Sequence, residues 1–548
     1  MERISIVNEN QSLEDCRNSW LFDETYHVWC LEDVLYTGKA TTPKFQRLSL
    51  FVPAEYMSTG GKVCPDGRHG RYTARTAPVV FENNAAGYMQ MPHTWLGGPR
   101  DEAGKYLERG MVYVTCGSRG RESVDSSGRR CAKAPWTLVD LKTAIRFLRH
   151  YAAILPGDFT RIISVGWSAG GAMSSLLGVT GNNPRYDRYL KMNGAYMDEK
   201  DDVFAAQVYC PIIDLEHADL AYEWQFRADR KNEDSPAGKA GTMTPFQEAL
   251  SGKLSEAYAA YFNGLRLKDP ATGACLALNP DGRSGSGYDY LMEQLDEAAS
   301  VYLRRLADSG SLRVSDYISG QYTYEAPAPA PAGTQERPPV SLGDLVSRPP
   351  KGAAYQAFEP AMVKKQGEDK RDWLTWDGKE AHIRDLDTYI LKHRRRMKPC
   401  TSFDTLGMDS GENQEFGTPD RDYMHFSEEI APAIAMLKDD FPDEYAQYYE
   451  AYAQTAEDAA LEQRKFLINP MNYIGTAEPD SGTCYYRIRV GASDADTSFM
   501  VSMALALKLK EAGKEADYAL VWDRPHCQAD YPGEVCDWIE TILQKAET

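Results

Sequence analysis

The stretch IISVGWSAGG, residues 162–171, joins an apolar run to a glycine-rich turn with a serine at its centre. The apolar part is long enough for a buried strand, and Gly166 and Gly170 stand two positions on either side of Ser168. Glycines are needed at these places when the backbone turns sharply from strand to helix and the serine projects from the turn. The same pattern also occurs in plain glycine turns, so the flanking elements have to decide whether Ser168 is a nucleophile.

Apolar runs and helical spacing around this turn predict a sheet covered by helices. Ala77–Phe81 comes before NNAAGY, Met111–Thr115 comes before CGSRG, and both runs have strand length. Residues 135–155 lie between the second run and the serine turn, and their leucines and isoleucines recur on one helical face. Strand, helix and strand joined by short loops are typical of a parallel sheet. Upstream, His27–Leu31 and Gln46–Val52 predict an antiparallel edge hairpin.

The strand pattern stops after Val203–Tyr209 and resumes near the C-terminus. There Tyr485–Val490 and Tyr518–Trp522 predict two strands with a helix between them, and EVCDWIETILQKA predicts a last helix. The long stretch before them is mostly helical or irregular, so we expect it to be an inserted lid. The predicted organisation is a first core part at 1–211, a lid at 212–400 and a second core part at 401–548. A proline-rich segment at about 325–350 is expected to be an exposed spacer rather than a docking peptide, because nothing aromatic or basic accompanies it.

Three polar residues are expected just past the carboxyl ends of parallel strands, where such sheets carry their active sites. They are Ser168, Asp494 in GASDAD and His526 in DRPHC, and this chain order is that of the α/β-hydrolases. The serine would need the imidazole to take its proton, and the imidazole would need the carboxylate to fix its tautomer. We therefore predict an α/β-hydrolase fold, with a mostly parallel central sheet flanked by helices, and this catalytic triad.

Each triad assignment has an alternative. A lone histidine is more often a surface or core residue, and His526 is one of nine. Asp496 competes with Asp494, and the pair could also be metal ligands. No set of acidic residues and histidines with metal-ligand spacing surrounds them, so no metal site is predicted.

The oxyanion of an acyl-transfer intermediate needs two hydrogen-bond donors. One donor is normally the backbone N–H after the nucleophile, here that of Ala169. The second is expected from the loop NNAAGYMQ, near Gly87, although a plain glycine turn explains that loop equally well.

Composition narrows the class of ligand. The 548-residue chain has a formal charge of −19, which argues against nucleic acid, because phosphate binding needs a basic face. Eleven scattered cysteines without a CxxC pair fit reduced thiols. No signal peptide or membrane-spanning run is recognised, so a cytoplasmic protein without membrane partners is expected. We expect no cofactor, and the sequence is silent on oligomeric state.

Several blocks of the sequence, in the same order, resemble one enzyme family. From about residue 45 onward they include SRGRESVDSSGRR, GWSAGGA, YCPIIDLEHADLAYEWQF, ENQEFG, RIRVGASDADTSF and WDRPH. The chain resembles bacterial tannases of the lactobacillus type, which are α/β-hydrolase serine esterases that cleave galloyl esters. Two features depart from the family pattern: the bulky Trp167 before the serine, and the longer insertion with its proline-rich segment.

The resemblance implies roles for individual residues. Ser168, Asp494 and His526 match the family's triad. The residues that hold the galloyl ring match Lys398 in RRMKP, Glu412 in GENQEFG and Asp496 in SDADTS. From the residues alone, Lys398 could be the end of a solvated basic run and Glu412 an exposed loop carboxylate.

The resemblance predicts a serine esterase that hydrolyses galloyl esters of tannins and simple alkyl gallates. A broader phenolic-acid esterase of the feruloyl type and a serine exopeptidase remain alternatives, because they use the same turn and triad order. A catalytically silent binding protein of the same fold is an alternative from another class. The expected partner in each enzymatic case is a small molecule, and for a tannase it is a phenolic ester.

Overall fold

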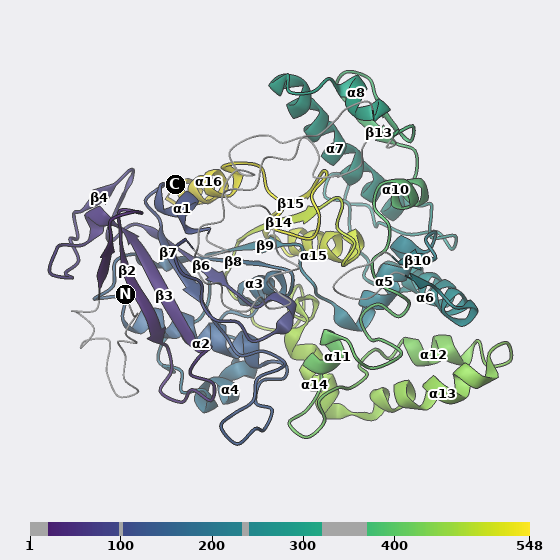
Figure 1. The fold of residues 1–548 in the computed structure, drawn as a ribbon, viewed down its shortest axis with the longest axis horizontal. Helices are drawn as coiled ribbons and strands as arrows, with labels where there is room; N and C mark the ends of the chain where they lie inside the picture. Colours follow the sequence, from purple (N-terminus) through teal and green to yellow (C-terminus); the bar gives the residue numbers. More distant parts are fainter. Residues whose placement is uncertain (1–19, 98–101, 233–240, 321–369, 548) are drawn as a thin grey trace, which may run out of the picture.

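A nine-stranded sheet forms the centre of the computed structural model, which describes residues 20–97, 102–232, 241–320 and 370–547 (Figure 1). Its strand order is β1-β2-β3-β7-β6-β8-β9-β14-β15. These strands are β1 (Leu21–Asp23), β2 (Val28–Leu35), β3 (Arg47–Pro53), β6 (Pro78–Asn83), β7 (Val112–Cys116), β8 (Asp158–Trp167), β9 (Ala205–Tyr209), β14 (Tyr485–Gly491) and β15 (Glu515–Val521). Short two-stranded ladders pair β4 (Arg68–His69) with β5 (Tyr72–Thr73), β10 (Lys231–Asn232) with β11 (Gly241–Thr242), and β12 (Leu374–Trp376) with β13 (Ala381–Ile383).

The sheet is parallel from β7 through to β15 and antiparallel from β1 to β7. The predicted antiparallel pairing of the first two runs is confirmed, because β2 and β3 pair antiparallel with a register shift between Leu31 and Val34. Their predicted position at the edge is wrong, because the short strand β1 pairs with β2 and forms the edge of the sheet. The predicted parallel strands are also present, and β6, β7 and β9 are buried along their whole length. Continuous apolar runs are typical of parallel strands because helices cover both faces of the sheet. The predicted α/β-hydrolase fold is therefore confirmed.

Helices pack on this sheet and continue into the insertion. In Figure 1, α1 and α16 lie on one side of the sheet and α2 and α4 on the other. The α-helices are α1 (Ala103–Leu107), α2 (Trp136–His150), α3 (Ala169–Val179), α4 (Asp187–Met192), α5 (Leu215–Phe226), α6 (Pro245–Gly264), α7 (Ser286–Ser309), α8 (Val314–Ser319), α10 (Leu386–Lys392), α11 (Gly411–Glu415), α12 (Ile430–Ala435), α13 (Pro442–Ala453), α14 (Ala459–Ile468), α15 (Phe499–Glu511) and α16 (Glu534–Glu547). Single 3₁₀ turns are η2 (Ala54–Tyr56), η3 (Ala86–Tyr88), η4 (Pro184–Tyr186), η5 (Gln454–Glu457) and η6 (Pro470–Asn472).

A long, mainly helical segment separates β9 from β14, although these two strands are neighbours in the sheet. Its helices lie on the right of Figure 1, from α7 at the top through α10 and α6 to α12 and α13 at the bottom, away from β2 and β3. Helices α11 to α14 fall within the predicted second core part, 401–548, yet they precede β14, the next strand of the sheet. The predicted boundary at residue 400 stays a prediction. The proline-rich segment at about 325–350 lies outside the described residues.

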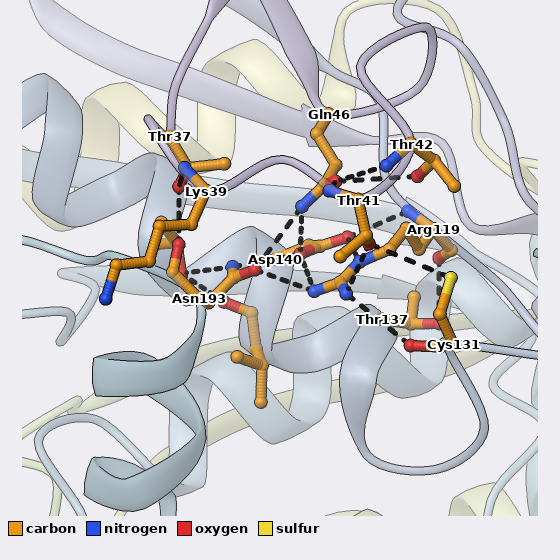
Figure 2. A network of polar contacts seen from close by, with 12 residues as sticks. Thr37, Lys39, Thr41, Thr42, Gln46, Arg119, Cys131, Thr137, Asp140 and Asn193 are labelled. Carbon is orange, nitrogen blue, oxygen red and sulfur yellow. Dashed lines mark hydrogen bonds and ion pairs between the residues drawn. The ribbon is translucent and has the colours of Figure 1, made fainter. Parts of the chain in front are cut away.

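A buried polar network fixes the loop that follows β7 (Figure 2). The guanidinium of Arg119 donates to both carboxylate oxygens of Asp140 on α2, and the two side chains are 3% and 0% exposed. Gln46, next to β3, donates to Asp140, and Arg119 also donates to Asn193 at the end of α4. A buried ion pair is stable only when hydrogen bonds satisfy its remaining polar atoms, and these neighbours supply them. The loop after β7 is thus tied to β3, α2 and α4.

The described helices and cysteines bear on two predictions from the sequence. Among the described helices, none is both long and apolar enough to cross a membrane. Among the described cysteines, Cys116, Cys210 and Cys400 are buried and form no disulfide.

Candidate active site

Ser168, His526 and Asp494 form a continuous chain of polar contacts at the carboxyl ends of β8, β15 and β14. The Oγ of Ser168 lies 2.8 Å from Nε2 of His526, and Nδ1 of His526 lies 2.8 Å from Oδ2 of Asp494. Asp494 is fully buried and His526 is 7% exposed. One ring nitrogen therefore faces the hydroxyl and the other faces a carboxylate, which is the arrangement a serine nucleophile requires. The structure brings together the three residues that the sequence predicted as a triad.

The backbone at Ser168 has a positive φ, which the close packing of the turn around it holds in place. Its φ of 61° and ψ of −128° lie in a region that residues with a side chain rarely adopt. A Cβ on Gly166 would lie 2.2 Å from the carbonyl oxygen of Gly170, and a Cβ on Gly171 would lie 2.3 Å from that of Tyr209. The glycines are thus required by close backbone contact, and the sequence pattern is a true strand-to-helix turn.

The electrostatic surroundings of His526 favour its protonated form. Burial alone lowers the pKa of the imidazole, but the Asp494 carboxylate, with smaller contributions from Cys210 and Asp496, raises the pKa well above 6.5. An anion in direct contact stabilises an imidazolium strongly in a buried environment. The ring of Trp167, 8% exposed, lies edge-on to the imidazole with the ring centroids 6.4 Å apart. This tryptophan, the residue that departs from the family pattern, therefore lies beside the imidazole.

The two predicted oxyanion donors lie on elements that pack together. Ala169 is the first residue of α3, and Gly87 sits in the η3 turn with a φ of 62°, a conformation that favours glycine. The turn contacts α3. The hydroxyl of Tyr88 donates to the carbonyl of Ile212, whose own N–H donates to the carbonyl of Ser168. The η3 turn is thereby held against the nucleophile turn.

Two of the three predicted ring-binding residues, Lys398 and Asp496, lie close to Asp494. The Nζ of Lys398 donates to the backbone carbonyl of Asp496 at 2.9 Å and lies 3.8 Å from the centre of the Phe403 ring. The N–H of Asp496 donates to Oδ1 of Asp494. Lys398 is buried, as is Arg396 two residues before it, so the alternative of a solvated basic run does not fit.

Glu412 belongs to a different element. It lies on α11, which packs on the η3 turn, and it is half-buried rather than a free loop residue. Its charge acts on that turn, because burial raises the pKa of Tyr88 and the carboxylates of Glu415 and Glu412 raise it further. Glu412 therefore approaches the site from the side of Gly87.

Comparison with solved structures identifies the family. The chain is 30% identical to the tannin acyl hydrolase from Lactobacillus plantarum, covering 94% of each chain with a TM-score of 0.72. The chain belongs to the tannase family. It is 28% identical to the Fusobacterium nucleatum tannase, over 94% of this chain and 95% of that one, with a TM-score of 0.72. A tannin acyl hydrolase in complex with ethyl gallate matches at 30% identity over 94% of both chains, with a TM-score of 0.71.

A family model described as BD-FAE also matches residues 122–241. No curated protein matches the chain. As a member of the tannase family with this hydrolase segment, the protein is a carboxylic ester hydrolase.

Two residues of this tannase family member, Asn83 and Arg121, support the site but were not singled out from the sequence. The side-chain amide of Asn83 donates to the carbonyls of Val165 and Gly170, on either side of Ser168. Arg121 donates from its backbone to Tyr88 and from its Nε to the carbonyl of Gly87. An amide at the end of a strand was an available signal, because Asn83 in NNAAGY is the last residue of β6. No local pattern pointed to Arg121, because its partners are distant in sequence.

Arg121 also connects the η3 turn to α11. Its guanidinium makes a short hydrogen bond to the side chain of Gln414, next to Glu415. Lys133 donates to the carbonyls of Arg121 and Gln414 at 2.8 Å each. Glu415 is buried nearby, and burial raises the pKa of its carboxyl to about 8, although Lys133 and Arg121 lower it. The loop after β7 thus joins the predicted oxyanion turn to the helix that carries Glu412.

Two groups of described residues have side chains spaced closely enough to hold a metal ion. One group with suitable spacing is Cys210, Asp494 and His526, which includes two triad members. The other is Asp214, Glu216 and His217. The side chains of this second group are already paired, since Asn469 donates to both carboxylates and His217 contacts Asp214.

Proposed function

We propose that this protein hydrolyses galloyl esters of tannins and simple alkyl gallates through a galloyl-enzyme formed on Ser168. Support comes from the contacts of 2.8 Å that join Ser168 to His526 and His526 to Asp494, in a chain 30% identical to a tannin acyl hydrolase that was solved with ethyl gallate. This combination of a complete nucleophile site and a family of gallate-binding relatives favours galloyl esters over other esters.

The proposed reaction has two halves. Ser168 Oγ attacks the galloyl carbonyl while Nε2 of His526 takes its proton, and Asp494 stabilises the resulting imidazolium. The N–H groups of Ala169 and Gly87 are the proposed donors to the oxyanion. The ester C–O bond then breaks, and His526 gives the proton to the departing alcohol. A water molecule attacks the galloyl-enzyme in the same way, which releases gallic acid and restores the serine.

Lys398, Glu412 and Asp496 are the proposed contacts of the galloyl hydroxyls. Three adjacent phenolic hydroxyls both donate and accept hydrogen bonds, so two carboxylates and one ammonium can satisfy all three. A methoxy group cannot donate, and a feruloyl ring would leave one of these half-buried carboxylates without a partner beneath the bound ring, at a cost of about 1 to 3 kcal/mol.

The proposal is tested by Ser168→Ala with methyl gallate as substrate. Loss of the nucleophile should lower kcat by about 10⁴-fold or more. Circular dichroism and the thermal midpoint serve as controls for folding. A folded variant that keeps near wild-type turnover would show that another group carries the chemistry.

The alternatives differ in substrate range. Initial rates on gallate, ferulate, acetate and aminoacyl esters would separate a tannase from a feruloyl-type esterase and from an exopeptidase. A protein that binds these ligands but is not labelled at Ser168 by a fluorophosphonate would be a silent binding protein.

A further inference from the structure

The loop that carries Asp494 is held by side chains from the segment inserted between β9 and β14. Three residues of the loop each contact a polar side chain of that segment. The hydroxyls of Tyr389 and Tyr222 donate to the backbone carbonyls of Ala492, at 2.5 Å, and Ala495, at 2.9 Å. The Oγ of Ser493 lies 3.1 Å from Nε2 of His393. The Nζ of Lys398 donates to the backbone carbonyl of the next residue, Asp496. The position of the triad acid therefore depends on residues outside the sheet.

His393 differs from the other contacts because it reaches both loops of the triad. Its Nε2 lies 3.1 Å from Oγ of Ser493 and 3.0 Å from Oδ1 of Asp523. Ser493 directly precedes Asp494, and Asp523 lies three residues before His526. The imidazole is 1% exposed, and its ring stacks on that of Trp522 with centroids 5.2 Å apart and planes 11° apart. One buried side chain thus bridges the acid loop and the base loop.

Ser493, His393 and Asp523 repeat the residue types of a catalytic triad but not its geometry. A proton relay uses the two ring nitrogens separately, one for the hydroxyl and one for the carboxylate, as in His526. In His393 both oxygens lie on the same nitrogen. This arrangement cannot pass a proton from one oxygen through the ring to the other, so it suits a structural bridge.

The far side of the bridge is anchored in the insertion as well. The hydroxyl of Tyr317, on α8, makes a short hydrogen bond to Asp523 and accepts one from the indole N–H of Trp522 at 2.8 Å. Arg371 donates to the backbone carbonyl of Tyr317 at 2.9 Å. The base loop is therefore fixed from two directions, by His393 after α10 and by Tyr317.

We propose that His393 is a positioning residue that sets the distance between Asp494 and His526 by joining their loops to the inserted segment. The inference rests on the triad of the proposed function. A hydrogen-bonded pair misplaced by about 1 Å loses on the order of 100-fold in rate, so a bridge of this kind should be visible in turnover.

The test compares His393→Phe with wild type. Phenylalanine keeps a ring that can stack on Trp522 but removes both polar contacts. The second-order rate constant for fluorophosphonate labelling of Ser168 and the kcat for methyl gallate should each fall by about 10- to 100-fold, while KM stays within about twofold. Labelling reports on the serine and histidine whatever the substrate, so it separates this role from galloyl binding.

A matched control is His382→Phe. His382 belongs to the same inserted segment and also contacts a carboxylate, that of Asp296 at 3.3 Å, but it is exposed. Its substitution should leave the labelling rate unchanged. An equal loss in both variants would show a general effect on the insertion and would overturn the proposal.

A second variant, Ser493→Ala, removes the contact between Ser493 and His393 from the side of the acid loop. The substitution removes one oxygen atom, so we expect the variant to fold. It should slow labelling by about fivefold, the factor that one hydrogen bond corresponds to, and add nothing further in the His393→Phe background. Wild-type labelling in Ser493→Ala and in folded His393→Phe, or a raised KM with unchanged kcat, would overturn the role of His393. Absence of labelling in the wild-type protein would instead overturn the proposed triad, and this inference with it.

Discussion

In the proposed mechanism the reactivity of Ser168 depends on the protonation of His526, so the surroundings of this imidazole predict a pH dependence. Asp494 more than offsets the effect of burial and raises the pKa of His526 above its ordinary value. The base must be neutral to accept the serine proton, so the fluorophosphonate labelling rate should rise with pH and reach half its maximum above pH 6.5, the ordinary histidine pKa. The measurement is the labelling rate between pH 5 and 9.

Asp494→Asn is the variant that tests the cause of this shift. An amide carries no charge, so the imidazolium loses its main stabilisation and the midpoint of the residual labelling should move to lower pH. A midpoint that stays in place would show that Asp494 does not set the pKa of His526.

Specificity is also a property of single residues. Asp496→Asn and Lys398→Ala each remove one proposed partner of the galloyl hydroxyls, so methyl gallate should lose more of its kcat/KM than methyl ferulate. The ratio of the two values should fall by about 5- to 100-fold, which corresponds to the free energy of one lost buried partner. An unchanged ratio in both variants would mean that these residues do not recognise the ring.

At the scale of elements, the turn between β8 and α3 has no room for a side chain at Gly166. Gly166→Ala would place a methyl group 2.2 Å from the carbonyl oxygen of Gly170. We expect this variant to be insoluble or to lose labelling of Ser168, because backbone and not a flexible side chain stands in the way. Gly252→Ala is the control, since it lies in α6 where a Cβ meets nothing within 4 Å. That substitution should raise stability by about 0.5 to 1 kcal/mol, and full labelling of Gly166→Ala would refute the account of the turn.

The sequence predicted the elements of the sheet because their signals are local. Apolar runs such as Val79–Phe81 and Ile162–Val165 are buried on both faces, and the glycines around Ser168 mark the turn. The proximity of Ser168, Asp494 and His526 could be predicted because each of them follows a parallel strand by a few residues. The support from the insertion could not, because His393 stands in a basic run and its partners lie 100 or more residues away. Side chains that pair across such separations leave no periodic signal.

At the scale of the whole molecule, the network around Arg119 joins the first strands, α2 and α4 to the loop that carries Arg121 (Figure 2). Asp140→Ala would leave the buried guanidinium of Arg119 without its carboxylate. We expect a loss of about 3 to 5 kcal/mol in the free energy of unfolding, measured by urea denaturation. Glu380→Gln removes the exposed pair with Lys379 and should leave the midpoint unchanged. An equal change in the free energy of unfolding in the two variants would show that burial does not decide how much an ion pair stabilises this protein.

The central claim is that galloyl esters are cleaved through a covalent intermediate on Ser168. Rapid acid quenching of the enzyme with methyl gallate, followed by mass spectrometry of its peptides, tests it most directly. One galloyl group should be found on the peptide that contains Ser168, and it should be absent from Ser168→Ala. A galloyl group on another residue, or wild-type turnover by Ser168→Ala, would contradict the claim.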